Sequence, residues 1–228
     1  MMMRTLQRQA VDRIKRHALG LSLGSPRAQA AILTEYLWAE EGAESTALHR
    51  VSEAAPGWVD KMISRQLEDE RRHAELLRNR LSELEADTTR PAPALMRAKL
   101  WWLERACAPY MGAFAAGPVV VLLAVAAQLE STGVRIFGRH LAVLEAQQSI
   151  GPTAIVIRSI LADETRHARS CAAAVERLVR EDERGELAAL RERIATIDRA
   201  FGVTIALGFW VVVAAHVLRD RQATERAS

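Results

Sequence analysis

Cysteine is scarce in this sequence, which has only Cys107 and Cys171 among 228 residues. Neither belongs to a C-x-x-C pair, so a disulfide framework, a zinc knuckle and a rubredoxin-type iron site within this chain are excluded. We expect both thiols to be buried. Aromatic residues are also few, at 5%, and no segment alternates apolar and polar residues as a β-strand does. Ala, Leu, Arg and Glu are abundant instead, and this composition predicts an all-α fold.

A strong excess of one charge is also lacking, since the net charge is +3 and the pI about 9.2. Such a mild basic balance permits contact with acidic lipid or nucleic acid without requiring either. The sequence contains no dedicated nucleic-acid module, and no G-x-G-x-x-G fingerprint for a nicotinamide or flavin cofactor. Electrons for any redox reaction must therefore come from a separate reductase or a small external donor.

Apolar residues at helical spacing, interrupted by glycine and proline, predict a series of helices. The expected helices span residues 27–54, 58–86, 95–110, 112–147 (with a kink or a start at Pro118), 152–183 and 186–221. The polar stretch 87–93 is the natural place for a long crossover. We expect a basic amphipathic N-terminal segment at 1–26, a metal-binding bundle at 27–185 and a hydrophobic C-terminal helix at 186–228, packed on the bundle or on a membrane.

Two segments of the sequence repeat one another. Residues 67–74 and 161–168 both read L-x-D-E-x-R-H-A, with six of eight positions identical. In each copy a Glu precedes a His by three residues, which places both side chains on one helix face, one turn apart. Carboxylate and imidazole together suit iron or manganese, and zinc less specifically. The repeat predicts that Glu70 and His73, and likewise Glu164 and His167, bind metal.

Each motif is preceded by a helix that can supply a further carboxylate. Glu130 lies inside an apolar stripe, where an uncompensated charge would cost several kcal/mol. In the first half Glu40 also shares an apolar stripe, and it lies about as far before Pro56 as Glu70 lies after it. We prefer Glu40 on these grounds, with Glu44 second.

Two further carboxylates compete for the same role, Glu35 and Glu41. Glu130 is followed three residues later by Gly133, and Glu40 by Ala43. Small residues at these positions leave room for metal between the helices.

The predicted ligands are Glu40, Glu70, His73, Glu130, Glu164 and His167. Two Glu residues combined with two Glu-x-x-His motifs form the constellation known from ferritin-like di-iron proteins. Four carboxylates balance the charge of two divalent ions, so such a core is tolerable with metal and costly without it. Asp69 and Asp163 directly precede the ligating glutamates, and we expect each to orient the His of the opposite motif.

The pattern resembles the ferritin-like di-iron carboxylate superfamily over roughly residues 30–170, and demethoxyubiquinone hydroxylases most of all. Residues 40–43 resemble that family's E-x-G-A ligand motif, Glu130-Ser131 follows a similar apolar run, and 163–167 resembles its last motif. This resemblance implies a ferritin-like four-helix bundle, two iron ions (or manganese) and O2-dependent hydroxylation. The extra N-terminal residues, a different first loop and a longer final helix depart from the family, so its quinone substrate does not carry over.

Residues 201–218 contain no Asp, Glu, Lys or Arg and are flanked by Arg199 and Arg219. The stretch is slightly short for a membrane span of about 20 residues. It is either a buried closing helix or an interfacial helix with basic flanks.

We expect a cytoplasmic monomer or homodimer that oxidises a small hydrophobic substrate. If residues 201–218 form an interfacial helix, we expect the protein to be peripheral on the membrane. The alternative function is a ferroxidase that stores or detoxifies iron.

Overall fold

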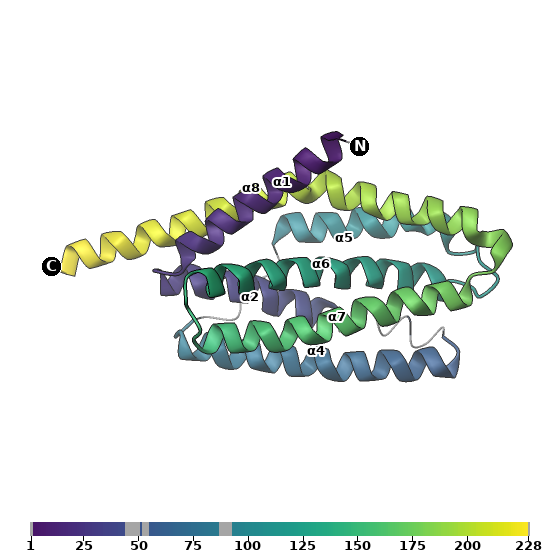
Figure 1. Ribbon diagram of the computed structural model, residues 1–228, viewed down its shortest axis with the longest axis horizontal. Coiled ribbons are helices and arrows are strands. Elements are labelled where there is room, and N and C mark those ends of the chain that lie inside the picture. Colours follow the sequence, from purple (N-terminus) through teal and green to yellow (C-terminus); the bar gives the residue numbers. More distant parts are fainter. Residues whose placement is uncertain (1, 44–50, 52–54, 87–92, 228) are drawn as a thin grey trace.

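The computed structural model describes residues 2–43, 51, 55–86 and 93–227, and within these residues it is all-α, with no strand (Figure 1). The α-helices are α1 (Met2–Ser22), α2 (Pro26–Ala43), α4 (Gly57–Glu83), α5 (Ala94–Cys107), α6 (Val119–Ala146), α7 (Pro152–Leu178) and α8 (Arg184–Ala227). Two short 3-10 helices, Ala108–Tyr110 and Glu181–Glu183, continue α5 and precede α8. The all-α prediction is confirmed for the described part of the chain.

Helix boundaries follow the glycine and proline signals, with the main difference at the end of α7. Pro118 marks the start of α6, which is one of the two alternatives expected for it. The helix expected over 152–183 ends at Leu178, because Val179 adopts an extended backbone and the Glu183 side chain accepts a hydrogen bond from the Arg180 N–H. That capping interaction begins a new helical segment instead of extending α7. The first expected helix is described only as far as Ala43.

Helices α2, α4, α6 and α7 lie side by side and form a bundle (Figure 1). A five-residue connection, 147–151, joins α6 to α7. In contrast, α4 and α6 run in the same direction, so the chain must return along the whole bundle between them (Figure 1). Helix α5 lies within this return, and residues 87–92, where the long crossover was expected, lie outside the described residues.

The long helix α8 lies across one face of the bundle together with α1 and α5 (Figure 1). Polar contacts tie these helices together: Arg139 of α6 pairs with Asp12 of α1 at 2.7 Å, and Lys99 of α5 pairs with Asp198 of α8 at 2.5 Å. The N-terminal segment is therefore a helix packed against the rest of the molecule. Helices α6 and α8 are long and apolar enough to cross a membrane by length and composition.

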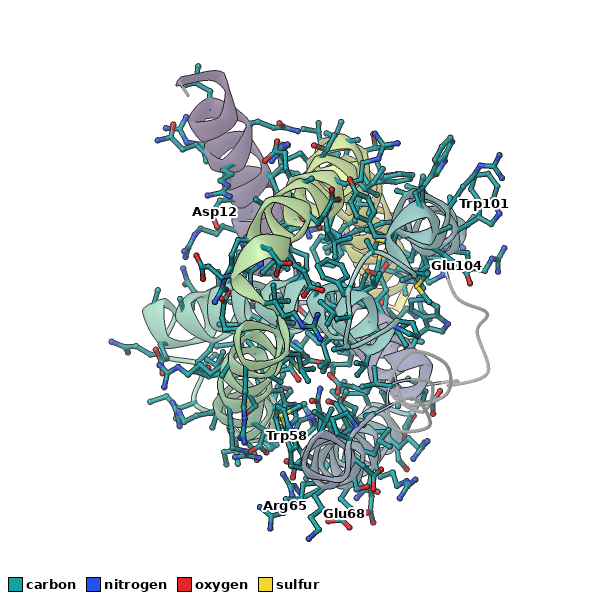
Figure 2. All side chains as sticks on the ribbon, turned by 90° about the vertical axis from the view of Figure 1, so that its right-hand side faces the viewer. Asp12, Trp58, Arg65, Glu68, Trp101 and Glu104 are labelled. Atoms are coloured by element: carbon teal, nitrogen blue, oxygen red, sulfur yellow. The ribbon has the colours of Figure 1, made fainter. Side chains whose placement is uncertain are left out.

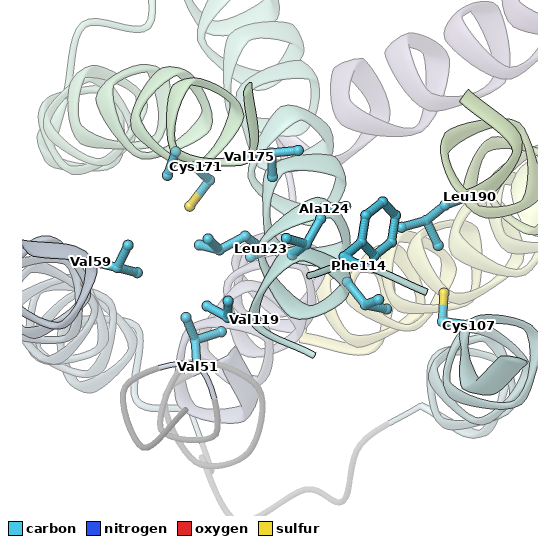
Figure 3. Close-up of a cluster of buried hydrophobic side chains, with 14 of the residues drawn as sticks. Val51, Val59, Cys107, Phe114, Val119, Leu123, Ala124, Cys171, Val175 and Leu190 are labelled. Atoms are coloured by element: carbon cyan, nitrogen blue, oxygen red, sulfur yellow. The ribbon is translucent and has the colours of Figure 1, made fainter. Parts of the chain in front are cut away.

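Two apolar clusters divide the bundle along its length. The first contains Val59, Leu123 and Cys171 (Figure 3). Leu67 also belongs to it, and the second contains residues of α2, α4, α6 and α7 nearer the opposite end. In α4 the first cluster ends at Leu67 and the second begins at Ala74. The predicted metal ligands of α4 lie in the interval between the two clusters, where apolar packing shields them from water on both sides.

Candidate metal centre

The six predicted ligands meet in the interior of the bundle, although they come from four helices. Glu40 lies on α2, Glu70 and His73 on α4, Glu130 on α6, and Glu164 and His167 on α7. All are buried, and the most exposed of them, Glu130, retains only 7% of its surface. Helical spacing explains the convergence, since each Glu-x-x-His pair occupies one face of its helix and both faces point to the same interval.

The ligands form two overlapping sets of four. One set contains Glu40, Glu70, His73 and Glu164, and the other contains Glu70, Glu130, Glu164 and His167. Within each set one nitrogen or oxygen atom of every residue lies within 4.8 Å of the others. Glu70 and Glu164 belong to both sets, so these two carboxylates lie where each can contact two ions at once.

Both imidazole rings present the same nitrogen to the carboxylates. Nδ1 of His73 lies 3.1 Å from Glu40 Oε2 and 3.7 Å from Glu70 Oε2. Nδ1 of His167 lies 3.2 Å from Glu70 Oε1 and 3.7 Å from Glu130 Oε2. The two halves of the centre therefore use the same ring nitrogen, although equivalent contacts differ in length: Nδ1 of His73 lies 3.1 Å from Glu40, whereas Nδ1 of His167 lies 3.7 Å from the corresponding Glu130.

The other nitrogen of each ring contacts the aspartate of the opposite motif. His73 Nε2 lies 3.2 Å from Asp163 Oδ2, and His167 Nε2 lies 3.1 Å from Asp69 Oδ2. The exchange of contacts expected from the sequence is present. A carboxylate acceptor holds the proton on Nε2, which leaves the lone pair of Nδ1 directed at the carboxylate cluster, the arrangement found around histidines that bind metal.

Two arginines close the centre on its outer side. Arg72 donates to Asp163 at 2.5 Å and Arg166 donates to Asp69 at 2.5 Å, and each also pairs with the aspartate of its own helix at 2.7 Å. Both guanidinium groups remain about half exposed. The arginines thus fix the aspartates, and the aspartates fix the imidazole rings.

Gly133 provides the space that one ligand occupies. A Cβ atom at this position would lie 1.9 Å from Oε2 of Glu164 and 3.0 Å from its Cδ. No side chain larger than hydrogen fits beside the carboxylate in this conformation. The small residue noted one turn after Glu130 therefore leaves room for the carboxylate of Glu164 on the adjacent helix α7.

Protons compensate the negative charge of the cluster when no cation is bound. Burial and the adjoining carboxylates Glu70 and Glu130 raise the pKa of Glu40 well above its usual value, and burial with similar neighbours raises the pKa of Glu164. Burial alone would lower the pKa of His167, but the carboxylates of Glu130 and Glu70 raise it to about 10. The two imidazole neighbours have the opposite effect on Glu70 and lower its pKa despite burial.

The residues present fit a metal ion. Glu70 Oε1 and His167 Nδ1 face one another at 3.2 Å, and both are buried with no hydrogen-bond partner among the described residues. Such a pair is satisfied by a proton on the imidazole or, when the imidazole is neutral, by a metal ion between the two atoms. With carboxylate oxygen and imidazole nitrogen as the donors, these buried Glu and His groups could hold a metal ion.

Two further buried residues belong to the centre, and the sequence analysis did not identify either of them. Nε2 of Gln66 donates to Glu130 Oε1 at 2.7 Å, and the Cys171 thiol donates to Oε1 of the same amide at 3.5 Å. Gln66 lies one turn before Glu70, and Cys171 one turn after His167. The only available signal was this spacing, because a single Gln or Cys at helical spacing carries no motif.

The other candidates lie elsewhere. Glu35 lines a separate cavity, and Glu44 and His49 lie outside the described residues. Tyr36 is buried against Phe137 and His140, with ring centroids 5.0 and 5.7 Å apart, which agrees with its expected place in the core.

The remaining titratable residues behave as expected. Burial lowers the pKa of His140 to about 4, and neither His140 nor His216 belongs to the donor sets. Cys107 and Cys171 are buried free thiols, as predicted.

No family model and no curated protein matches the chain. The function therefore has to be inferred from the site itself.

Proposed function

We propose that this chain is an O2-dependent di-iron oxidoreductase of the ferritin-like class, a hydroxylase or monooxygenase that acts on a hydrophobic, lipid- or quinone-like substrate. The observation that carries the proposal is the pair of overlapping donor sets that share Glu70 and Glu164. Two ions held side by side by shared carboxylates are the arrangement of ferritin-like di-iron proteins. Iron, when bound, would supply the reactivity towards O2, and a separate reductase or small donor the electrons.

The chain's own residues have three roles in this proposal. Glu40 and His73 would hold one ion and Glu130 and His167 the other, while Glu70 and Glu164, which belong to both donor sets, could contribute to both. Gln66 limits the movement of Glu130 through its 2.7 Å hydrogen bond. The apolar clusters on either side exclude water, which strengthens the electrostatic interactions within the centre.

Metal content is the first test of the proposal. Protein loaded with Fe(II) without oxygen is expected to bind about two ions per chain, and Glu70→Ala/Glu164→Ala is expected to bind none, because each ion loses two of its four donors. Glu68→Ala/Glu75→Ala is the matched control, since it removes two exposed carboxylates from α4. Elemental analysis of all three decides the matter, and equal iron content in wild type and the shared-carboxylate variant would contradict the proposal.

Reaction with O2 separates the two functions. An oxidoreductase consumes O2 in proportion to added substrate and reductant, whereas a ferroxidase consumes it in proportion to added Fe(II) and retains the ferric product. A large symmetric assembly would favour iron storage, and a monomer or homodimer favours the oxidoreductase.

A hydrophobic substrate is supported by the apolar surface of α5 and α8. Trp101 and Trp102 of α5 are 53% and 46% exposed, and Trp101 points away from the molecule (Figure 2). Leu207 and Val211 of α8 are similarly exposed, and Leu95 of α5 lies against Gly208 of α8. Exposed tryptophans beside arginine are typical of membrane interfaces, and Arg105 lies over the Trp101 ring. Peripheral membrane attachment of a cytoplasmic protein follows as part of the proposal.

Replacement of both tryptophans tests this surface. Trp101→Ser/Trp102→Ser is expected to weaken binding to vesicles with anionic lipid about tenfold or more, because two large apolar groups no longer leave water. Ile150→Ser/Ile155→Ser removes two apolar residues that are even more exposed, one just before α7 and one in its first turn, and should bind like wild type. Vesicle co-sedimentation measures all three proteins. If the tryptophan variant sediments like the control, these tryptophans do not contact the membrane.

A further inference from the structure

A second group of polar side chains lines a cavity of about 90 Å³ between α1, α2, α5, α6 and α8. Lys15 comes from α1, Glu35 and Tyr36 from α2, and Arg139 from α6. The rest of the lining is mostly apolar and includes Phe209 of α8. The cavity thus combines a few convergent polar groups with an apolar wall, as ligand sites commonly do.

Lys15 and Glu35 are the charged side chains of this cavity that form no ion pair among the described residues. Arg139 pairs with Asp12, and the neighbouring Lys99 pairs with Asp198. Lys15 is half-buried, and among the described residues it forms no ion pair with a carboxylate. A partly buried ammonium without an anionic partner is unfavourable, so it provides a binding position for an acceptor oxygen.

The electrostatic surroundings of Lys15 agree with that assignment. Burial, with the positive charges of Arg139 and Lys99, lowers the pKa of Lys15 to about 8, while Glu35 and Asp198 oppose the shift. Burial raises the pKa of Glu35, and the positive charge of Lys15 opposes that shift. These groups face Lys15 from α6, α5, α2 and α8.

The cavity and the candidate metal centre share helix α2. Tyr36 and Ala39 form part of the cavity wall, and Glu40 follows Ala39 directly on α2. The ring of Tyr36 is also packed against Phe137 and His140. Tyr36 therefore precedes Glu40 by about one helix turn on the same segment of α2.

We propose that this cavity binds the carboxylate head of a fatty-acid-like amphiphile, with Lys15 as its charge partner. The proposal rests on the function proposed above, since it names the substrate class of the same centre. A volume of about 90 Å³ accommodates only a head group, because pockets that enclose a drug-sized ligand measure about 300–1,000 Å³. The chain of the amphiphile would extend past Met96 and Phe209 towards the exposed apolar residues Leu95 and Leu207.

Calorimetric titration of metal-free, full-length protein with decanoate tests the proposal. Lys15→Met is expected to bind decanoate about tenfold or more weakly, because a charge-assisted contact is lost. Lys15→Arg should retain binding. Arg13→Met, which removes an exposed cation from the same helix, should bind like wild type. Decanol, which has the same chain without the charge, should bind more weakly to wild type than decanoate does.

The dependence on pH gives a second measurement that needs no unstable variant. Decanoate binds the protonated form of Lys15, so wild-type affinity should fall as the pH rises from 7 through about 8. Lys15→Arg should not show this decline, because arginine stays protonated. Equal affinity of Lys15→Met and wild type, or of decanol and decanoate, would overturn the proposal.

Failure of this proposal is distinguishable from failure of the proposed function. The titrations use metal-free protein and do not depend on iron or O2. Iron binding without preference for decanoate would refute the carboxylate cavity alone. Lys15-dependent binding of decanoate in a protein that binds no iron would leave the cavity and refute the oxidoreductase.

Discussion

Gly133→Ala is expected to abolish or strongly weaken metal binding while the helices remain folded. The new Cβ would lie 1.9 Å from Oε2 of Glu164, so the carboxylate must rotate away. That movement is inexpensive for the fold, because the obstructing atom is the end of a flexible side chain, and alanine favours a helix by about 1 kcal/mol relative to glycine. It is costly for the centre, because Glu164 belongs to both donor sets.

We expect the affinity for Fe(II) to fall by about 100-fold or more, since loss of an outer contact alone typically costs 10- to 100-fold. Gly138→Ala is the matched control on the same helix, because its Cβ would meet Leu161 Cδ1 at an ordinary 3.9 Å. Metal titration together with thermal unfolding of both variants measures the effect. Wild-type iron affinity in Gly133→Ala would show that Glu164 does not bind metal in the observed conformation.

Stability is expected to depend on pH in opposite directions with and without metal. Glu40, Glu130 and Glu164 have raised pKa values in the folded protein, so above the ordinary value of 4.5 the folded chain binds more protons than the unfolded chain. His167, with its pKa raised to about 10, extends this difference above 6.5. The lowered pKa values of His140 and Lys15 oppose this trend below about 6.5 and above about 8, respectively, but they are fewer. We therefore expect the free energy of unfolding of the metal-free protein to decrease as the pH rises from about 5 to 9.

Carboxyl groups whose pKa is lowered in the folded protein affect its stability in a different, more acidic pH range. Asp69, Asp163 and Glu70 lose their stabilising contribution only as the pH falls below about 4. Metal binding requires deprotonated ligands, so its stabilising effect should grow with pH. At a free metal concentration of 100 times Kd, metal binding raises the free energy of unfolding by about 2.7 kcal/mol. This corresponds to an increase of about 5–10 °C in Tm for a chain of this length.

Thermal unfolding at pH 5, 7 and 9, with EDTA or with Mn(II), measures both slopes. Glu70→Ala/Glu164→Ala is expected to show no gain in Tm from Mn(II) at any pH, and Glu68→Ala/Glu75→Ala to follow wild type. A metal-free protein that becomes more stable between pH 5 and 9 would contradict the proton compensation described for the cluster.

The sequence was sufficient to place the six candidate ligands because the repeat restricts them. Two copies of D-E-x-R-H fix four ligands and both aspartates, and the apolar stripe around Glu130 identifies a fifth. The choice between Glu35 and Glu40 also follows from geometry. Five residues of helix rotate a side chain by about 140° relative to the first, so Glu35 faces the cavity beside Lys15 when Glu40 faces the metal centre.

Contacts between distant helices could not be predicted from the sequence. Gln66 meets Glu130 and Cys171 across three helices, and no local pattern marks it. The packing of α1 against α8 could not be predicted from the sequence either, because an amphipathic helix can pack against protein or against lipid. The length of α7 was overestimated for a local reason. The residues after Leu178 favour a helix, but the capping interaction at Arg180 begins a separate helical segment.

The exchange of contacts between the two motifs has a consequence for the ancestry of the fold. Asp69 serves the ring of His167 and Asp163 serves the ring of His73, so each half of the chain completes the other. Two identical helical hairpins related by a two-fold axis would make the same reciprocal contacts, since such a symmetric interface pairs each patch with its own copy. The present chain has the form expected of a shorter ancestor that assembled in pairs, with its duplicated halves joined end to end through the segment that now contains α5.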